Sequence, residues 1–102
     1  MLKTIQNKQQ AIKQLCMKYH VKKLEVFGSA VRGDFSPQNS DIDFLVEFTS
    51  KGIADYANSF FGLQAGLQNL FNTHIELVVS STIKNPFFLE SIEQDRTYLY
   101  AA

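Results

Sequence analysis

The chain has few of the residues that mark secreted or membrane-spanning proteins. Its 102 residues include one cysteine, two prolines and no tryptophan. Because Cys16 is the only cysteine, no intrachain disulfide can form, and we expect its thiol to be a small core residue in a reducing compartment. The first twenty residues lack the apolar run of a signal peptide, and no run approaches the roughly 18 apolar residues of a membrane span. We therefore expect a cytoplasmic protein.

The chain also has no excess of positive or negative charge. Ten Lys and Arg residues balance ten Asp and Glu residues, so the formal net charge is +0. Proteins that bind DNA or RNA usually carry a basic footprint, and its absence argues against a nucleic-acid partner. A chain of this length is large enough for one hydrophobic core and too small for a second lobe. We expect residues 1–102 to form a single domain.

Hydrophobic periodicity predicts that helices and strands alternate along the chain. Apolar residues recur at helical spacing over residues 4–19 and again over 53–71. Asn85-Pro86 has the pattern of a cap and first position of a short helix that ends near residue 94. Strands are expected at residues 23–27, 42–48, 73–79 and 98–100. This order indicates an α/β (α+β) two-layer domain, with a small mixed sheet, helices on one face and the other face open.

The first expected strand ends in a Gly-Ser pair that has the features of a phosphate cradle. Gly28 has no Cβ to hold a ligand away, and Ser29 can cap the next turn and offer its hydroxyl to a phosphate. Backbone N–H groups at the start of such a turn point toward an anion. Arg32, one turn later, can neutralise phosphate charge or pair with a surface acid such as Asp34.

Acidic side chains on two later strands have the spacing of metal ligands. Asp41 and Asp43 are two residues apart, so they should share a strand face and repel each other unless a cation lies between them. Mg²⁺ or Mn²⁺ suits such a pair and leaves positions for water and phosphate oxygens. Glu76 has the same phase on its strand and can complete a two-metal site. Ser40 either begins the strand or bonds within the loop, and His74 is expected to be exposed.

These features together resemble the minimal nucleotidyltransferases of the DNA polymerase beta superfamily. The resemblance rests on Gly28-Ser29, Arg32-Gly33, Ser40-Asp41-Ile42-Asp43 and the later acidic strand, and it covers most of the chain. It implies a nucleotidyltransferase fold whose open face is the active-site face.

The resemblance also implies roles for single residues. Gly28 and Ser29 would hold the phosphates, with Arg32 and Ser40 as further nucleotide-binding residues. Asp41 and Asp43 would bind one or two Mg²⁺ or Mn²⁺ ions, and Glu76 would complete the metal site and help to activate the attacking hydroxyl. Relatives usually have Asp at this third position, and the extra methylene of Glu76 moves its carboxylate.

The activity and partner also follow from the resemblance. Small members of the family look like antitoxins that transfer AMP from ATP to a hydroxyl of a helical HEPN toxin, which implies a HEPN-family partner here. The alternative is a catalytically inactive nucleotide-binding module that neutralises its partner by steric contact. Adjacent aromatic residues at Phe60-Phe61 and Phe87-Phe88 diverge by about 100° on a helix, so one of each pair should be exposed. A patch formed by Phe61 and either Phe87 or Phe88 would suit a protein partner or a homodimer.

Overall fold

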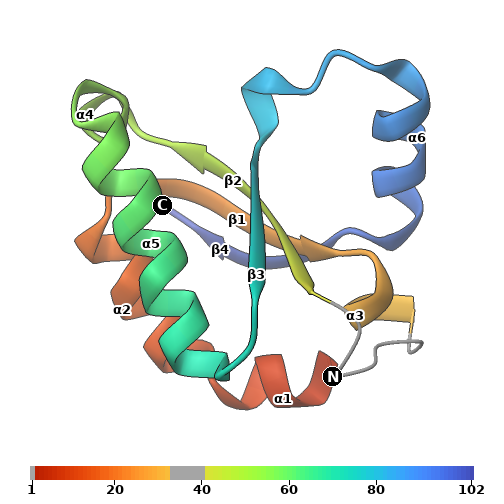
Figure 1. Ribbon diagram of the computed structural model, residues 1–102, viewed down its shortest axis with the longest axis horizontal. Helices are drawn as coiled ribbons and strands as arrows, with labels where there is room; N and C mark the ends of the chain where they lie inside the picture. The colour runs from red at the N-terminus through yellow and green to blue at the C-terminus, as the bar shows by residue number, and fades with distance from the viewer. Residues whose placement is uncertain (1, 33–40) are drawn as a thin grey trace.

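The computed structural model describes residues 2–32 and 41–102, in which helices surround a four-stranded sheet (Figure 1). Ser40, Gly33 and the loop 34–39 lie outside the described residues. The elements are α1 (Leu2–Asn7), α2 (Gln9–Lys18), β1 (Val21–Phe27), α3 (Ser29–Arg32), β2 (Ile42–Phe48), α4 (Ser50–Ala54), α5 (Tyr56–Phe71), β3 (Ile75–Val79), the 3-10 turn η1 (Ser80–Thr82), α6 (Pro86–Asp95) and β4 (Thr97–Ala101).

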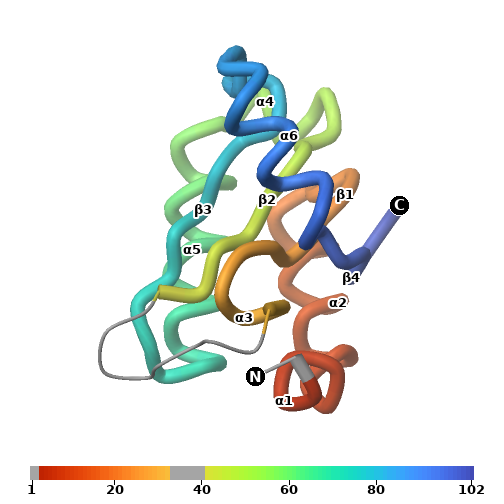
Figure 2. Tube along the Cα trace, turned by 90° about the vertical axis from the view of Figure 1, so that its right-hand side faces the viewer, coloured from red at the N-terminus to blue at the C-terminus, as the bar shows by residue number. Residues whose placement is uncertain are grey.

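The strands form a mixed sheet in the order β3-β2-β1-β4. Strand β1 pairs antiparallel with both β2 and β4, whereas β2 pairs parallel with β3. Figure 2 shows β1, β2 and β3 side by side, with α3 at the end of β1. The predicted two-layer α/β class and mixed sheet are confirmed, and the expected terminal strand is an edge strand beside β1.

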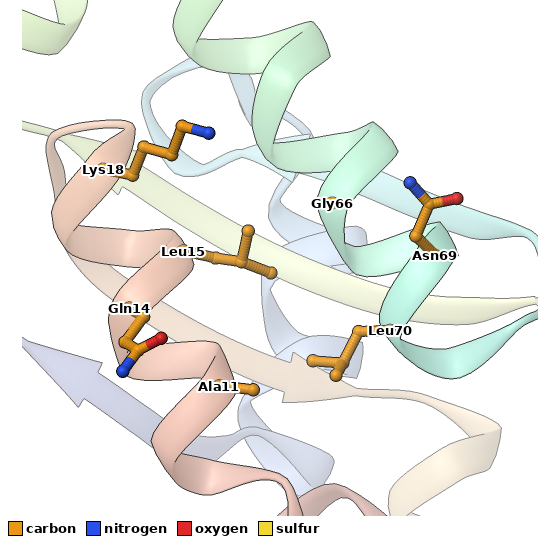
Figure 3. A pocket seen from close by; sticks show the side chains of 7 residues that line it. All are labelled: Ala11, Gln14, Leu15, Lys18, Gly66, Asn69 and Leu70. Carbon is orange, nitrogen blue, oxygen red and sulfur yellow. The ribbon is translucent and has the colours of Figure 1, made fainter.

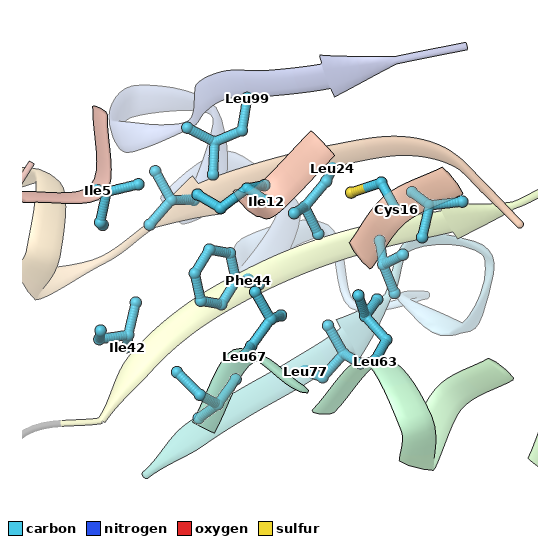
Figure 4. Packing of buried hydrophobic residues seen from close by; sticks show 14 of the residues in the cluster. Ile5, Ile12, Cys16, Leu24, Ile42, Phe44, Leu63, Leu67, Leu77 and Leu99 are labelled. Atoms are coloured by element: carbon cyan, nitrogen blue, oxygen red, sulfur yellow. The ribbon is translucent and has the colours of Figure 1, made fainter. Parts of the chain in front are cut away.

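One face of the sheet is buried under α2 and α5. The alternation in β2 puts Ile42, Phe44, Val46 and Phe48 on this face, and all four are buried. Helix α5 contributes Leu63 and Leu67 to the same cluster, and α1 and α2 contribute Ile5, Ile12 and Cys16 (Figure 4). Burial raises the pKa of the Cys16 thiol to about 12, which fits the expected role of a small core residue.

The second face carries the acidic residues and is only partly open. Helix α6 packs on it, and Ile92 of α6 is 2% exposed in a cluster with Phe27 and Leu45. In Figure 1, α6 lies on the opposite side of the strands from α2 and α5. The expectation that all helices cover one face therefore needs correction. Since Phe27 and Leu45 are apolar and point away from the main core, they require a cover of their own.

Each of the two long predicted helices is interrupted. The first breaks at Lys8 into α1 and α2, and the second breaks at Asp55 into α4 and α5. Asp55 has φ −123° and ψ 53°, outside the helical region, so the apolar stripe cannot continue across it. The prediction that Ile53 is part of the buried stripe is wrong, because this side chain is 61% exposed.

Helix α6 begins where the sequence predicts. Asn85 is the cap, and its Oδ1 accepts hydrogen bonds from the backbone N–H groups of Phe87 and Phe88, followed by Pro86 at the first turn. Phe87 is 80% exposed and Phe61 of α5 is 64% exposed. These two rings belong to helices on opposite faces of the sheet, so they do not form one patch. In the described part of the chain, no helix has the length and apolarity to cross a membrane.

Candidate active site

The turn after β1 brings backbone and side-chain groups close to the strand acids. Gly28 has φ +77°, a conformation that L side chains rarely adopt, and its carbonyl accepts hydrogen bonds from the N–H groups of Val31 and Arg32. A Cβ at Gly28 would lie 2.6 Å from Oδ2 of Asp43. Both the backbone conformation and the close approach therefore require glycine. Ser29 is the first residue of α3 and is half-buried beside this turn.

Three neighbouring strands carry the next components of the site. In the β1–β2 register Phe27 pairs with Asp43, and in the β2–β3 register Asp43 pairs with Glu76. Gly28 directly follows Phe27, so the order across the sheet is the glycine turn, then Asp43, then Glu76. Residues paired in register share a face, so Asp43 and Glu76 lie side by side. Asp43 is half-buried and Glu76 is exposed.

The surroundings of Asp43 favour its protonated form. Partial burial raises the pKa of Asp43 to about 6, and a side-chain hydrogen bond with Glu76 adds to the increase. The negative charges of Glu76 and Asp41 raise it further, while Arg32 opposes them. A cation bound beside Asp43 would relieve the repulsion between its carboxylate and those of Glu76 and Asp41.

Asp41 lies just before β2 and has a partner of its own. Its Oδ2 is 3.1 Å from Nδ1 of His74, and the backbone N–H of Ile42 donates to the His74 carbonyl. Asp41 still acts on Asp43 through its charge. Within residues 2–32 and 41–102, no three His, Cys, Asp or Glu side chains gather closely enough to hold a metal ion. The protein therefore offers a carboxylate pair, Asp43 and Glu76, and the substrate would have to supply further oxygen ligands.

Arg32 connects the glycine turn to the end of α6. Its guanidinium lies 2.8 Å from Oδ2 of Asp95, and its charge also reaches Asp43. Of the two uses considered for Arg32, pairing with a surface acid is therefore observed, and the acid is Asp95. The two residues are 63 positions apart, so no local spacing could have indicated the contact.

A further acid on this face, besides Asp43 and Glu76, was not predicted from the sequence. Glu25 of β1 is 3% exposed, and Arg96 donates to both of its carboxylate oxygens, over 2.6 Å and 2.8 Å. These bonds lower the pKa of Glu25 below its ordinary value, against the effect of burial. Arg96 also contacts Glu93, and Lys23 lies 3.3 Å from Glu25. The available signal was an acid inside the apolar run of β1.

A groove lies on the opposite face of the sheet from the strand acids, and its lining is mostly apolar or uncharged. It runs between α2 and α5, has a volume of about 500 Å³, and is lined by Leu15, Lys18, Gly66 and Leu70 among others (Figure 3). None of its lining residues is acidic. It is separated from Asp43 and Glu76 by the sheet, so it is not the site formed by the strand acids.

Comparisons with known proteins agree with this geometry. The family model for the nucleotidyltransferase domain matches residues 8–99. The chain belongs to this family. A relative from Methanocaldococcus jannaschii, provisionally named as a protein adenylyltransferase, is 42% identical over 82 residues, which are 80% of each chain. The resemblance seen in the sequence is therefore confirmed at the level of the family.

Solved structures with the same fold include isolated family members and complexes. One minimal nucleotidyltransferase, also provisionally named, has a TM-score of 0.71 at 26% identity and covers 94% of this chain and 93% of its own. Another is a complex of the Shewanella oneidensis HEPN toxin, carrying three AMP groups, with an MNT antitoxin. Its TM-score is 0.60 at 19% identity, and it covers 96% of this chain and 73% of that one, so it supports the fold alone.

Proposed function

We propose that this nucleotidyltransferase transfers AMP from ATP to a hydroxyl group of a partner protein, and that it is the antitoxin of a HEPN-family toxin. The observation that carries the proposal is the pairing of Asp43 with Glu76 directly beside the glycine turn. The names of its relatives support the choice of AMP and of a protein acceptor, and the AMP-carrying HEPN toxin bound to an MNT antitoxin supports the choice of partner. ATP as the donor is consistent with a cytoplasmic location.

The donor set fits Mg²⁺ or Mn²⁺. Asp43 and Glu76 would hold the ion, Asp41 would add negative charge, and phosphate oxygens would complete the shell. Bound there, a divalent ion would neutralise the triphosphate and polarise the α-phosphate. The register pairing of Asp43 with Glu76 supports this assignment, because two neighbouring carboxylates repel each other and a cation between them relieves that repulsion.

In the proposed reaction, the residues of the chain bind, orient and accept a proton. The Gly28 turn and Ser29 hold the β- and γ-phosphates, so the α-phosphorus lies toward Asp43. The acceptor oxygen forms a bond to the α-phosphorus, and the bond from that phosphorus to the bridging oxygen of the β-phosphate breaks. Pyrophosphate leaves with that electron pair, and the proton of the acceptor passes to the Glu76 carboxylate. The products are an AMP ester of the partner and pyrophosphate.

A second candidate function is inhibition by contact without catalysis. It is favoured by the Glu at position 76, where the family usually has Asp. In this reading the protein binds nucleotide and blocks its partner sterically.

Labelled-AMP transfer separates the two functions. We would mix the protein, ATP labelled at the α-phosphate and the protein encoded by the neighbouring gene, and measure incorporation and toxin inhibition together. Glu76→Gln should abolish incorporation and leave partner binding nearly intact, whereas Glu76→Asp should retain or increase incorporation. Glu47→Gln, an exposed-side substitution on β2, is the matched control and should behave as wild type. Full inhibition by every variant without incorporation would leave only the contact mechanism.

A further inference from the structure

A concave surface lies beside Glu76, between the end of β3 and the start of α6. Its volume is about 320 Å³, enough for one large side chain. We call it the β3–α6 pocket. Its lining includes the apolar side chains of Val78, Ile83 and Phe88 and the charged side chains of Glu76 and Lys84. Phe88 is 41% exposed and packs edge-on against Phe27, with 6.2 Å between ring centroids.

Much of the polar capacity around the pocket is already used within the protein. The hydroxyl of Thr82 donates to the Val79 carbonyl over 2.7 Å. Oδ1 of Asn85 accepts from the first backbone N–H groups of α6. Within residues 2–32 and 41–102, Lys84 has no acidic partner. The lining therefore offers apolar contacts, the negative charge of Glu76 on the strand and the positive charge of Lys84.

The chemistry of AMP transfer requires the acceptor on this side of the site. In an in-line displacement the attacking oxygen approaches opposite the leaving pyrophosphate. The glycine turn that would hold the pyrophosphate follows β1, Asp43 is on the middle strand β2, and Glu76 is on β3. The attacking oxygen must then come from the β3 side, and the β3–α6 pocket is the concavity that adjoins Glu76 there.

We propose that the β3–α6 pocket binds the acceptor segment of the partner protein: a hydroxyl-bearing side chain with apolar neighbours on Val78, Ile83 and Phe88, and an acidic neighbour on Lys84. This inference rests on the proposed function, because the direction of attack defines the acceptor side. It assigns recognition of the acceptor to residues outside the Gly-Ser and acidic motifs. The two adjacent phenylalanines of α6 then have different roles, since Phe88 lines the pocket and Phe87 does not.

Peptide binding tests the pocket without requiring catalysis. We would titrate the isotope-labelled full chain with two synthetic peptides of equal length, each with a central hydroxyl residue in an apolar sequence. One peptide carries acidic neighbours and the other carries basic neighbours. We expect the acidic peptide to shift the backbone NMR signals of Val78, Ile83 and Phe88, and to bind about tenfold more tightly than the basic one. Mg-ATP alone should leave the signals of Ile83 and Phe88 nearly unchanged, whereas Val78, two residues from Glu76 on β3, is expected to respond to the metal.

Matched variants make the assignment specific. Phe88→Ala should weaken the acidic peptide about tenfold, and Phe87→Ala, the same substitution on the neighbouring residue, should leave its Kd unchanged. Lys84→Glu should reverse the preference between the peptides, whereas Lys13→Glu on α2 should not. Thermal unfolding of each variant verifies that it is folded. Equal effects of the two phenylalanine variants, or of the two lysine variants, would overturn the proposal.

The remaining outcomes separate this inference from the proposed function. If the acidic peptide binds in the pocket while wild type transfers no AMP to peptide or partner, the pocket is a docking site and the transferase function is wrong. If wild type transfers AMP and Phe88→Ala leaves the KM for the acceptor unchanged, the function stands and the pocket assignment is wrong. Shifts of Ile83 and Phe88 caused by Mg-ATP alone would make the pocket a nucleoside site and would equally overturn the assignment.

Discussion

The two faces of the sheet are built from the same strands but are stabilised in different ways. On the face under α2 and α5, Phe44 and its neighbours are fully buried among aliphatic side chains. On the face under α6, carboxylates lie between apolar residues: Glu25 is buried and held by Arg96, and Asp43 is half-buried beside Glu76, with its pKa raised to about 6. Alternation along each strand separates the two chemistries. The first face stabilises the fold by burial alone, whereas the second face contains both a stabilising ion pair at Glu25 and a destabilising acid at Asp43.

Truncation on the packed face should have the largest effect. Phe44→Ala removes a fully buried ring and leaves a cavity, so we expect a loss of about 3–5 kcal/mol in the free energy of unfolding. Val78→Ala, a half-buried position on the second face, should cost about 1 kcal/mol. Urea unfolding at neutral pH measures both values. Similar losses for the two variants would contradict the difference between the faces.

The buried ion pair on the second face should have the next largest effect. Glu25→Gln leaves Arg96 partly buried without its main partner, and we expect a loss of about 2 kcal/mol at neutral pH. The pKa of Glu25 is lowered in the folded state, so its contribution is present above its ordinary pKa and disappears as the pH falls through the folded value. The free energies of unfolding of wild type and Glu25→Gln, measured from pH 7 to pH 3, should converge as the pH falls. A difference that stays constant over this range would contradict the stabilising role of the Glu25 charge.

The charge of Asp43 should have the opposite effect on the free energy of unfolding, which it lowers. Its folded pKa is raised to about 6, so the folded state holds a proton that the unfolded state releases. The resulting cost in stability is absent below the ordinary pKa near 3.8, grows between there and about 6, and is complete above it. Discounted for solvent screening, Asp43→Asn should stabilise the metal-free protein by about 1–2 kcal/mol at pH 7.5.

The same variant should lose function while it gains stability. Asp43→Asn is expected to abolish Mg-dependent ATP binding, and added Mg²⁺ should raise the Tm of wild type but not of the variant. Calorimetric titration with Mg-ATP and thermal unfolding in EDTA provide the two readouts. A variant that is destabilised, or that binds Mg-ATP as tightly as wild type, would show that Asp43 is not a metal-site acid.

The smallest predicted effect concerns one neutral contact to the nucleotide. Ser29→Ala should weaken triphosphate binding by about 1 kcal/mol, roughly fivefold in Kd, if the hydroxyl donates to a phosphate. Ser50→Ala at the start of α4, away from the glycine turn, is the matched control. Calorimetry with Mg-ATP measures both. Identical affinities in the two variants would remove Ser29 from the phosphate cradle.

The parts of the fold that sequence predicted well are those with strong local signals. The expected strand 42–48 has the bounds of β2, and Asn85 with Pro86 starts α6 as expected. The break at Asp55 was missed because α4 and α5 both continue the apolar spacing, and only the backbone at that residue departs from a helix. The second-face location of α6 was missed because its helical pattern does not identify which face of the sheet it covers.

The sequence by itself determined which residues share a face, since strand alternation places Asp43 away from the core and Glu76 in the same phase. Only the structure showed why Gly28 cannot be replaced, because its φ of +77° and its approach to Asp43 are not visible in the sequence. Only the tertiary structure decided that β3 lies beside β2 in the register that joins Asp43 to Glu76, that Asp41 pairs with His74, and that Asp95 reaches Arg32. The physical reason is that contacts between distant segments depend on chain closure and on the burial of whole elements, and neither leaves a local pattern in the sequence.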